Sequence, residues 1–242
     1  MEPLIEIKDL YKSFGENRVL NGFKLDLYEG ENLVIVGKSG SGKSVLLKCI
    51  VRLLEADSGT LKVLGQPIPG LDQYTLDQIR TEVGFLFQGS ALYDSMTVRE
   101  NLEFPLRRHP EKINSQGVET MVLNTLRSVG LAHTIDLMPE ELSGGMQRRI
   151  ALARTLILQP RIILYDEPTS GLDPITSKEI IELMLKVQKE YQASALIITH
   201  DMDCARVISN RMIILFDGQN HAEGTYSELS RSSDPVVQAF FK

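Results

Sequence analysis

The 242-residue sequence has no tryptophan, only two cysteines and no long apolar run. Its longest unbroken apolar stretch is Met212–Phe216, whereas a bilayer-spanning helix needs about 20 such residues, so we expect no membrane-spanning helix. The first residues lack the basic and apolar regions of a secretory signal, which argues against secretion. Cys49 and Cys204 belong to no C-x-x-C pair or disulfide framework, and we expect both to be buried thiols.

Neither sign of charge is in large excess: 26 Lys and Arg residues stand against 32 Asp and Glu residues, a net charge of −6. A general nucleic-acid-binding protein normally has a basic face, so we expect no nucleic-acid partner. With 43% hydrophobic and 24% charged residues, the composition is that of a folded globular chain. No repeat or linker divides the chain, which predicts a single cytosolic domain over residues 1–242.

Three short apolar runs are typical of strands buried on both faces of a parallel sheet, because polar and apolar residues do not alternate in them. These runs are Leu33–Val36, Ile162–Tyr165 and Leu196–Ile198. Helical periodicity lies between them, from Val45 onward and from Thr176 to Tyr191. Strands that alternate with helices predict an α/β fold in which a parallel sheet has helices on both faces.

The two helical patterns also predict particular contacts. In the first, one apolar stripe comprises Leu46, Cys49, Ile50, Leu53 and Leu54. In the second, the inward residues are Ile180, Ile181, Met184 and Leu185. Glu182 and Lys186 stand four positions apart on its outer face, in the orientation that favours an ion pair.

Two stretches depart from the α/β pattern. Residues 4–27 alternate and contain a hairpin-like turn at Phe14–Asn17, which predicts antiparallel strands. Residues 89–159 lack a buried strand and consist of helical patterns joined by loops. We therefore expect a core made of residues 1–88 and 160–242, including the antiparallel strands, with residues 89–159 inserted as a helical subdomain.

A glycine-rich segment between the first apolar run and the following helix satisfies G-x-x-x-x-G-K-[ST]. Its residues are Gly37, Lys38, Ser39, Gly40, Ser41, Gly42, Lys43 and Ser44. Glycines let backbone N–H groups approach phosphate oxygens, and the helix N-terminus favours negative charge. Lys43 can then reach the β- and γ-phosphates, while the Ser44 hydroxyl can bind Mg²⁺. The alternative is a glycine-rich turn with an incidental Lys-Ser pair.

Two acidic residues follow the second apolar run. Asp166 suits the magnesium side of a phosphate site, and Glu167 suits a general base that accepts a proton from the attacking water. Adjacent side chains on an extended segment point in different directions, so the two carboxylates can serve these different roles. The alternative is a solvated acidic loop.

A second glycine-containing segment, Leu142–Met146, opens another helical pattern. Ser143 before Gly144 and Gly145 is a good N-cap, and in many proteins it is nothing more. Its hydroxyl, the exposed N–H groups and the helix dipole can also form a second anion site.

With these motifs in this order, the whole chain resembles the ATP-binding cassette (ABC) ATPases. Gly37–Ser44 matches the Walker A loop and Ile162–Glu167 the Walker B segment with its catalytic glutamate. The signature LSGGQ is matched by Leu142, Ser143, Gly144, Gly145 and Met146, with Gln147 just behind. The resemblance implies a P-loop NTPase core with a RecA-like parallel sheet, an antiparallel β subdomain and a helical signature subdomain. It also implies ATP and Mg²⁺ as cofactors.

The same resemblance gives roles to isolated residues. Gln88 matches the Q-loop glutamine, a Mg²⁺ ligand and catalytic residue, and His200 matches the catalytic switch histidine. Asp173, in Ser170–Asp173, matches the D-loop. Phe14 falls where the family stacks an aromatic ring on adenine, with Tyr11 a less favoured candidate. The other histidines, His109, His133 and His221, are expected to be packing or capping residues.

The family resemblance implies a homodimer that sandwiches two MgATP. Walker A of one subunit and the signature of the other hold each nucleotide, so ATP favours the closed dimer and hydrolysis releases it. The dimer is expected to drive a membrane permease dimer. Gln88 and the apolar residues after it would form a groove for a cytoplasmic permease helix; these residues are Leu92, Tyr93, Met96 and Val98. The alternative is that they pack the helical insertion onto the core.

Less generic segments resemble the ATPases of Mla/Mce-type phospholipid transporters of diderm bacteria. These segments are Leu86–Tyr93 with Met96, Val98, Asn101 and Pro105–His109; Leu137–Met146 with Arg148 and Arg149; Asp173–Thr176; and Asp234–Phe240. The resemblance implies a peripheral position on the cytoplasmic face of the inner membrane and an MCE-domain partner, and leaves a STAS-domain partner open. The alternatives are the ATPase of another ABC importer or exporter, and a non-transport ABC switch such as a cell-division regulator.

Overall fold

A six-stranded sheet at the centre of the fold has the strand order β10-β9-β3-β8-β7-β6. The structure, a computed structural model, describes residues 2–241; Met1 and Lys242, the ends of the predicted single domain, lie outside that range. The strands are β3 (Asn32–Val36), β6 (Val83–Leu86), β7 (Ile162–Asp166), β8 (Ser194–Thr199), β9 (Arg211–Phe216) and β10 (Gln219–Gly224). All neighbours are parallel except β10, which pairs antiparallel with β9.

A second, antiparallel sheet is formed near the N-terminus, in the order β2-β1-β4-β5. Its strands are β1 (Ile5–Phe14), β2 (Asn17–Leu27), β4 (Ser58–Val63) and β5 (Gln66–Pro67). The predicted hairpin turn is present, since Phe14 pairs with Asn17 across the β1–β2 connection. The α/β fold with an N-terminal antiparallel sheet is therefore confirmed.

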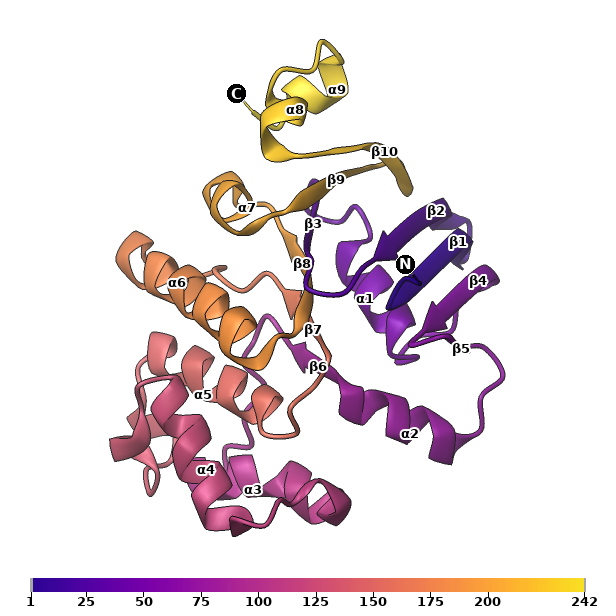
Figure 1. The fold of residues 1–242 in the computed structure, drawn as a ribbon. Coiled ribbons are helices and arrows are strands. Elements are labelled where there is room, and N and C mark those ends of the chain that lie inside the picture. The colour runs from indigo at the N-terminus through magenta and orange to yellow at the C-terminus, as the bar shows by residue number, and fades with distance from the viewer. Residues whose placement is uncertain (1, 242) are drawn as a thin grey trace.

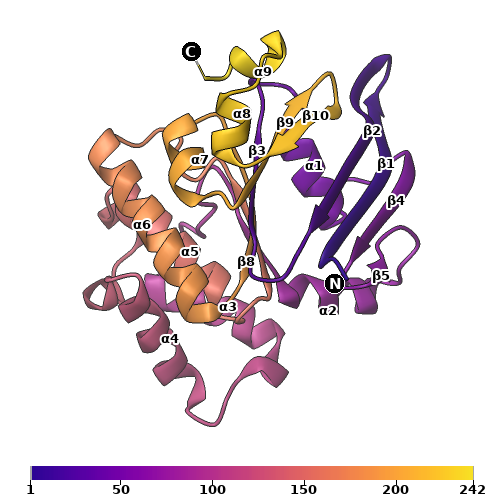
Figure 2. The same cartoon turned by 45° about the horizontal axis from the view of Figure 1, so that its top comes forward.

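Helices cover both faces of the large sheet (Figures 1 and 2). They are α1 (Lys43–Ile50), α2 (Gln73–Glu82), α3 (Val98–Arg108), α4 (Gly117–Ser128), α5 (Gly144–Leu156), α6 (Pro174–Tyr191), α7 (Met202–Ile208), α8 (Tyr226–Ser230) and α9 (Pro235–Gln238). Short 3₁₀ turns are η1 (Pro110–Lys112), η2 (Ala132–Thr134) and η3 (Pro139–Glu141). Among residues 2–241, no helix combines the length and the apolar character that crossing a bilayer requires.

Alternate residues of the central strands enter two different apolar cores. Leu33 and Ile35 of β3 lie in a core shared with α1 and the antiparallel sheet. Val34 and Val36 lie in the core on the opposite face, which α3 to α7 help to fill. Both faces of each strand are buried, which is why these segments read as continuous apolar runs rather than alternating ones.

All elements within residues 89–159 are helical, and they lie at one end of the molecule, away from the antiparallel sheet (Figure 1). These helices share their apolar core with one face of the large sheet, through residues such as Leu102, Ile150 and Ile163. The subdomain boundaries at residues 89 and 159 therefore stay a prediction.

Two contacts predicted from helical periodicity are wrong. Helix α1 ends at Ile50, so Leu53 and Leu54 lie beyond it, and 52% of Leu53 is exposed. Lys186 does not pair with Glu182; its ammonium group donates to the backbone carbonyl of Ser128 at 3.0 Å. This partly buried hydrogen bond takes the place of a surface ion pair, which would contribute only about a few tenths of a kcal/mol to stability.

Candidate functional site

The glycine-rich loop joins the carboxyl end of β3 to the first turn of α1 and is pressed against β2. A Cβ atom on Gly42, whose φ is +99°, would lie 2.6 Å from Cγ1 of Val19. A Cβ on Gly37 would lie 2.6 Å from the Ser41 hydroxyl oxygen. Gly40 has open space around it but a φ of +78°, so there the requirement is conformational. Glycine is thus required for space at two positions and for backbone conformation at a third.

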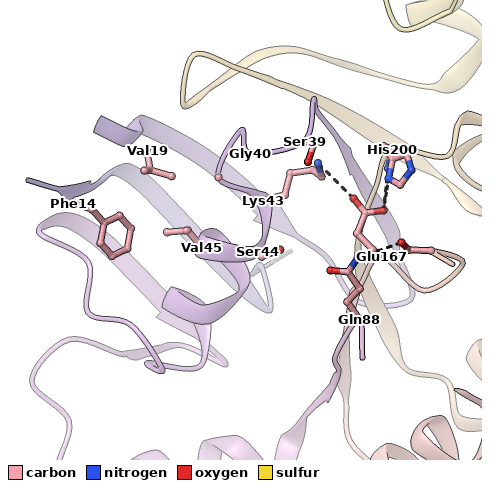
Figure 3. A pocket seen from close by; sticks show the side chains of 12 residues that line it. Phe14, Val19, Ser39, Gly40, Lys43, Ser44, Val45, Gln88, Glu167 and His200 are labelled. Atoms are coloured by element: carbon pink, nitrogen blue, oxygen red, sulfur yellow. Dashed lines mark hydrogen bonds and ion pairs between the residues drawn. The ribbon is translucent and has the colours of Figure 1, made fainter. Parts of the chain in front are cut away.

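The carboxyl ends of the parallel strands bring the other predicted residues to the same edge of the sheet. Asp166 ends β7 and Glu167 follows it; His200 follows β8, and Gln88 comes shortly after β6. Gln88, Glu167 and His200 line a pocket of about 600 Å³, together with Ser39, Gly40 and Lys43 (Figure 3). Asp166 does not line it, but it contacts Ser44, which does.

Lys43 lines this pocket, is almost fully buried, and points its ammonium group towards Glu167 (Figure 3). It donates to the backbone carbonyls of Gly37 at 2.7 Å and Lys38 at 3.1 Å, and lies 3.5 Å from Oε1 of Glu167. The Lys43 ammonium group is therefore held between the backbone carbonyls at the start of the loop and the Glu167 carboxylate.

The two adjacent carboxylates have different partners. Asp166 accepts a hydrogen bond from the Ser44 hydroxyl at 3.0 Å. Glu167 points to the other side, where its Oε2 accepts from the backbone N–H of His200 at 3.2 Å and lies 2.8 Å from Nδ1 of that ring. Burial raises the pKa of Asp166; the negative charge of Glu167 adds to this, and the Ser44 hydrogen bond opposes it.

Glu167 has a φ of +50°, an uncommon value for a residue other than glycine. Such a conformation costs about 1–3 kcal/mol and persists only where the surrounding structure fixes it. Here the backbone N–H of Glu167 donates to the Ile198 carbonyl of β8, and its carbonyl accepts from Ser170. The strained backbone aims the carboxylate at Lys43 and His200.

One end of the pocket is apolar and is formed by Phe14, Val19 and Val45 (Figure 3). Phe14 is 49% exposed at the β1–β2 turn, and the Lys12 ammonium group lies 5.3 Å from the centroid of its ring. Lys12 is in turn held by Asp57 at 2.8 Å. Tyr11, the other aromatic candidate, lines a different hollow beside Gly22.

The residues of Leu142–Met146 do not line this pocket. Ser143 caps α5, its hydroxyl accepting from the Met146 N–H at 3.3 Å. Asp173 caps α6 in the same way, and a Cβ on Gly145 would lie 2.7 Å from Cγ2 of Thr176. The signature residues and Asp173 therefore lie together where α5 and α6 begin, apart from the pocket of their own chain.

The remaining candidates, the two cysteines and the other three histidines, lie outside the pocket, and His133 is exposed rather than packed. Cys49 and Cys204 are buried, and burial raises their thiol pKa values to about 11 and about 12. His109 lies beside Glu111 and His221 beside Asp234, and none of His109, His133 and His221 lines the pocket.

The groove predicted after Gln88 is wrong for one residue. Val98 is 0% exposed and belongs to the core, whereas Tyr93 is 43% exposed. Leu92 and Met96 are half-buried. The packing alternative therefore holds for Val98, because it begins α3 and faces the other helices.

Three residues that contact the site received no individual role from the sequence, although Ser170 lies in the segment matched to the D-loop. Val19 lines the pocket and lies close to Gly42. Ser170 also lines the pocket, and its hydroxyl accepts a hydrogen bond from the Gln88 amide at 3.2 Å. Arg148 is buried and donates to the carbonyl of Phe87, the residue before Gln88, at 2.8 Å. An apolar pattern predicted α5 correctly, but it gave no signal that this arginine turns inward.

The residues present fit Mg²⁺ and a triphosphate. Within residues 2–241 there is no cluster of three or more His, Cys, Asp or Glu side chains that could hold a metal without help. The Ser44 hydroxyl and the Asp166 carboxylate lie 3.0 Å apart and are oxygen groups of the kind that Mg²⁺ prefers. Mg²⁺ typically uses one or two protein ligands together with phosphate oxygens and water. The Ser41 hydroxyl, buried in the loop with no hydrogen-bond partner among the described residues, is a further polar group facing the loop interior.

Comparisons with known proteins agree with this geometry. A family model described as "ABC transporter" matches residues 20–170. The chain belongs to the ABC transporter family. It is 40% identical to the probable ribonucleotide transport ATP-binding protein mkl of Mycobacterium leprae, over 99% of this chain and 69% of that protein. It is 37% identical to the protein TRIGALACTOSYLDIACYLGLYCEROL 3, chloroplastic, of Arabidopsis thaliana, over 99% of this chain and 73% of that one.

Among solved structures, the ABC chain is similar to the dimeric ATP-binding cassette MJ0796 in a post-hydrolysis state bound to ADP and Pi. The TM-score is 0.82 at 33% identity, covering 91% of this chain and 98% of that one. This ABC chain is accordingly an ATP hydrolase that uses ATP with Mg²⁺.

Proposed function

We propose that this chain is the ATP-hydrolysing subunit of an ABC transporter that moves phospholipids in the envelope of a diderm bacterium, as Mla/Mce-type systems do. It would lie on the cytoplasmic face of the inner membrane, bound to a permease dimer and near an MCE-domain protein. Two observations support the lipid assignment: the resemblance of segments such as Leu86–Tyr93 and Leu137–Met146, and the relative from Arabidopsis thaliana whose name refers to a glycerolipid.

The observation that carries the hydrolytic role is the position of Glu167. Its carboxylate lies 2.8 Å from His200 Nδ1 and 3.5 Å from the Lys43 ammonium group, beside the Ser44–Asp166 pair. A carboxylate in this place can accept the proton of a water that attacks the γ-phosphate, which accelerates such reactions about 10²–10⁴-fold. His200 would hold the carboxylate in this orientation.

The other residues bind and orient the nucleotide. The N–H groups of residues 37–44 and the start of α1 would surround the phosphates, with Lys43 reaching the β- and γ-phosphates. Phe14 would stack on adenine, and Ser44, Asp166 and Gln88 would hold Mg²⁺. When bound, Mg²⁺ neutralises negative charge on the transferred phosphoryl group.

Two copies of the chain would complete each other's sites. Leu142–Met146 lie outside the pocket of their own chain, yet offer a capped helix N-terminus suited to an anion. A second subunit facing the first would place these groups, with Asp173 nearby, against the γ-phosphate. Closure of the dimer would change the conformation of the permease, and ATP hydrolysis would allow the dimer to reopen.

The decisive experiment is Glu167→Gln. Loss of the base should lower kcat by about 10²–10⁴-fold while leaving MgATP affinity within about threefold, because the phosphate contacts lie elsewhere. Steady-state hydrolysis and equilibrium nucleotide binding measure these two quantities. Glu179→Gln is the matched control, since this exposed carboxylate pairs with Arg149 outside the pocket. Unchanged turnover in Glu167→Gln would refute the assigned base.

The same variant tests the dimer. In a Glu167→Gln background, Ser39→Cys and Ser143→Cys should crosslink between subunits only when MgATP is present. The two native cysteines are buried and have raised thiol pKa values, so they should react slowly with the crosslinker. Absence of an intersubunit product at saturating MgATP would exclude the sandwich.

A different cargo is the second candidate, because the 40% identical relative has a name that refers to ribonucleotide transport. Co-purification of the chain with its membrane partner separates the two. Bound phospholipid would support the lipid transporter, whereas a polar solute without lipid would favour the alternative.

A further inference from the structure

Arg148 is a buried arginine that has no carboxylate in hydrogen-bonding contact within residues 2–241. It lies in the second turn of α5, is 5% exposed, and donates through Nη1 to the Phe87 carbonyl at 2.8 Å and through Nη2 to the Ser170 carbonyl at 3.5 Å. Its Nε has no hydrogen-bond partner among the described residues. A buried guanidinium bound only by carbonyls is costly, and a neutral residue of similar size would avoid this cost but could not donate to both carbonyls.

The two carbonyls belong to segments that also meet at Gln88. Phe87 directly precedes Gln88, and the Gln88 amide donates to the Ser170 hydroxyl at 3.2 Å. The contacts therefore close a ring that runs from Arg148 to Phe87, along the backbone to Gln88, across to Ser170, and back to Arg148. Because each segment is held by two others, none can shift without the ring breaking.

Each member of this ring comes from a different part of the site. Ser170 donates its backbone N–H to the Glu167 carbonyl, so its position is linked to that of the strained glutamate. Arg148 lies on α5, whose N-cap is Ser143. The Arg148 guanidinium thus connects three segments. They are helix α5, which begins at the signature segment, the Phe87–Gln88 backbone after β6, and the loop after Glu167.

Asp166 is the charged group that acts on Arg148 from the neighbouring strand. Burial lowers the pKa of Arg148, and the negative charge of Asp166 opposes this. No hydrogen bond joins the two side chains among the described contacts, so the attraction acts through space while the directed contacts go to the two carbonyls.

We propose that Arg148 is a positioning residue that couples α5 to Gln88 and to the loop after Glu167, so that these three parts of the site move as one body. This inference rests on the proposed hydrolytic function and adds to it the link between the signature helix and the pocket.

The test is a double-mutant cycle on the full chain. Arg148→Met fills the same space without donors, and Ser170→Ala removes the hydroxyl that holds Gln88. Arg148→Met alone should lower kcat about tenfold or more with KM for MgATP changed less than about threefold, because small displacements of catalytic groups cost that much. In the Ser170→Ala background the same change should lower kcat less than about twofold, since the ring is already broken. Equal, additive losses in both backgrounds would overturn the proposal.

A second measurement does not depend on activity. Amide hydrogen exchange over residues 87–93 should accelerate in Arg148→Met, and not in Arg149→Met. Arg149 is the matched control because it is the next residue of α5, is half-buried, and pairs with Glu179 of α6 outside the ring. Unchanged exchange in Arg148→Met would also overturn the proposal, even if the chain proved inactive towards MgATP. Should Arg148→Met fail to fold by circular dichroism, Arg148→Gln takes its place in both experiments.

Discussion

The hydroxyl of Ser44 donates a 3.0 Å hydrogen bond to Oδ1 of Asp166, and so joins the first turn of α1 to the end of β7 across 122 positions of sequence. Ser44 lines the pocket, and Asp166 lies directly behind it through this hydrogen bond. The pair suits a hard divalent cation, because both groups offer oxygen atoms.

The Mg²⁺ requirement should depend on pH through Asp166. Burial raises the pKa of this carboxyl above its usual 3.8, so protons compete with the metal at a higher pH than they would at an exposed aspartate. We expect the Mg²⁺ concentration for half-maximal hydrolysis to rise as the pH falls towards the raised pKa of Asp166. Asp136→Asn, at an exposed carboxylate, should leave this pH dependence intact, whereas Asp166→Asn should remove it together with most of the activity.

The same pKa shift gives the sign of a stability effect. The folded chain holds the Asp166 proton more tightly than the unfolded chain, so the free energy of unfolding contributed by this group falls as pH rises from 3.8 through the raised pKa. Urea unfolding of the wild type and of Asp166→Asn at several pH values would measure it. A contribution that instead grows with pH across this interval would show that the carboxyl is not destabilised by burial.

The glycines of the loop should differ in the cost of adding a methyl group. Gly40→Ala meets only an unfavourable φ and should lower the free energy of unfolding by about 1 kcal/mol. Gly42→Ala adds a 2.6 Å contact with Val19 and should cost about 3 kcal/mol or more. Urea unfolding measures both. Equal losses of unfolding free energy in the two variants would mean that Val19 of β2 moves aside without cost when a methyl group is added to Gly42.

Phe14 should contribute to nucleotide affinity through its ring alone. Phe14→Ala should raise KM for MgATP about tenfold with little change in kcat, because stacking of one base is worth about 1–3 kcal/mol. Phe14→Tyr should retain the wild-type KM, since it keeps the ring. Tyr11→Ala is the matched control, because Tyr11 lies in a different hollow. Steady-state kinetics decide, and a KM increase in Tyr11→Ala as large as that in Phe14→Ala would reassign the stacking residue.

Local patterns predicted the elements that carry the site. β3, β7 and β8 were identifiable because burial on both faces gives continuous apolar runs, and the β1–β2 hairpin because one residue in two is polar. Ser143 was identifiable as a cap because its oxygen meets an N–H only three residues away. The antiparallel edge strand β10 was not predicted, since its polar sequence resembles a loop.

The predictions that were wrong relied on residue spacing along the chain, whereas tertiary contacts decide where a helix ends and which groups a side chain meets. Leu53 has the right spacing for the α1 stripe, but the helix stops at Ile50. Lys186 has a glutamate at the favourable spacing, but a carbonyl of α4 lies within its reach. Val98 looked available to a partner because nothing in its own segment shows that α4 and α5 cover it.

The sequence by itself determined the glycine-rich loop, the paired acidic residues after β7 and the helix caps, since glycine freedom, charge and helix capping act over a few positions along the chain. Only the tertiary structure decided that Arg148 would face Phe87 and Ser170, that Val19 would press on Gly42, and that Leu142–Met146 would lie outside their own pocket. Such contacts join segments tens of residues apart, and their free energy depends on how whole elements pack, which no short stretch of sequence encodes.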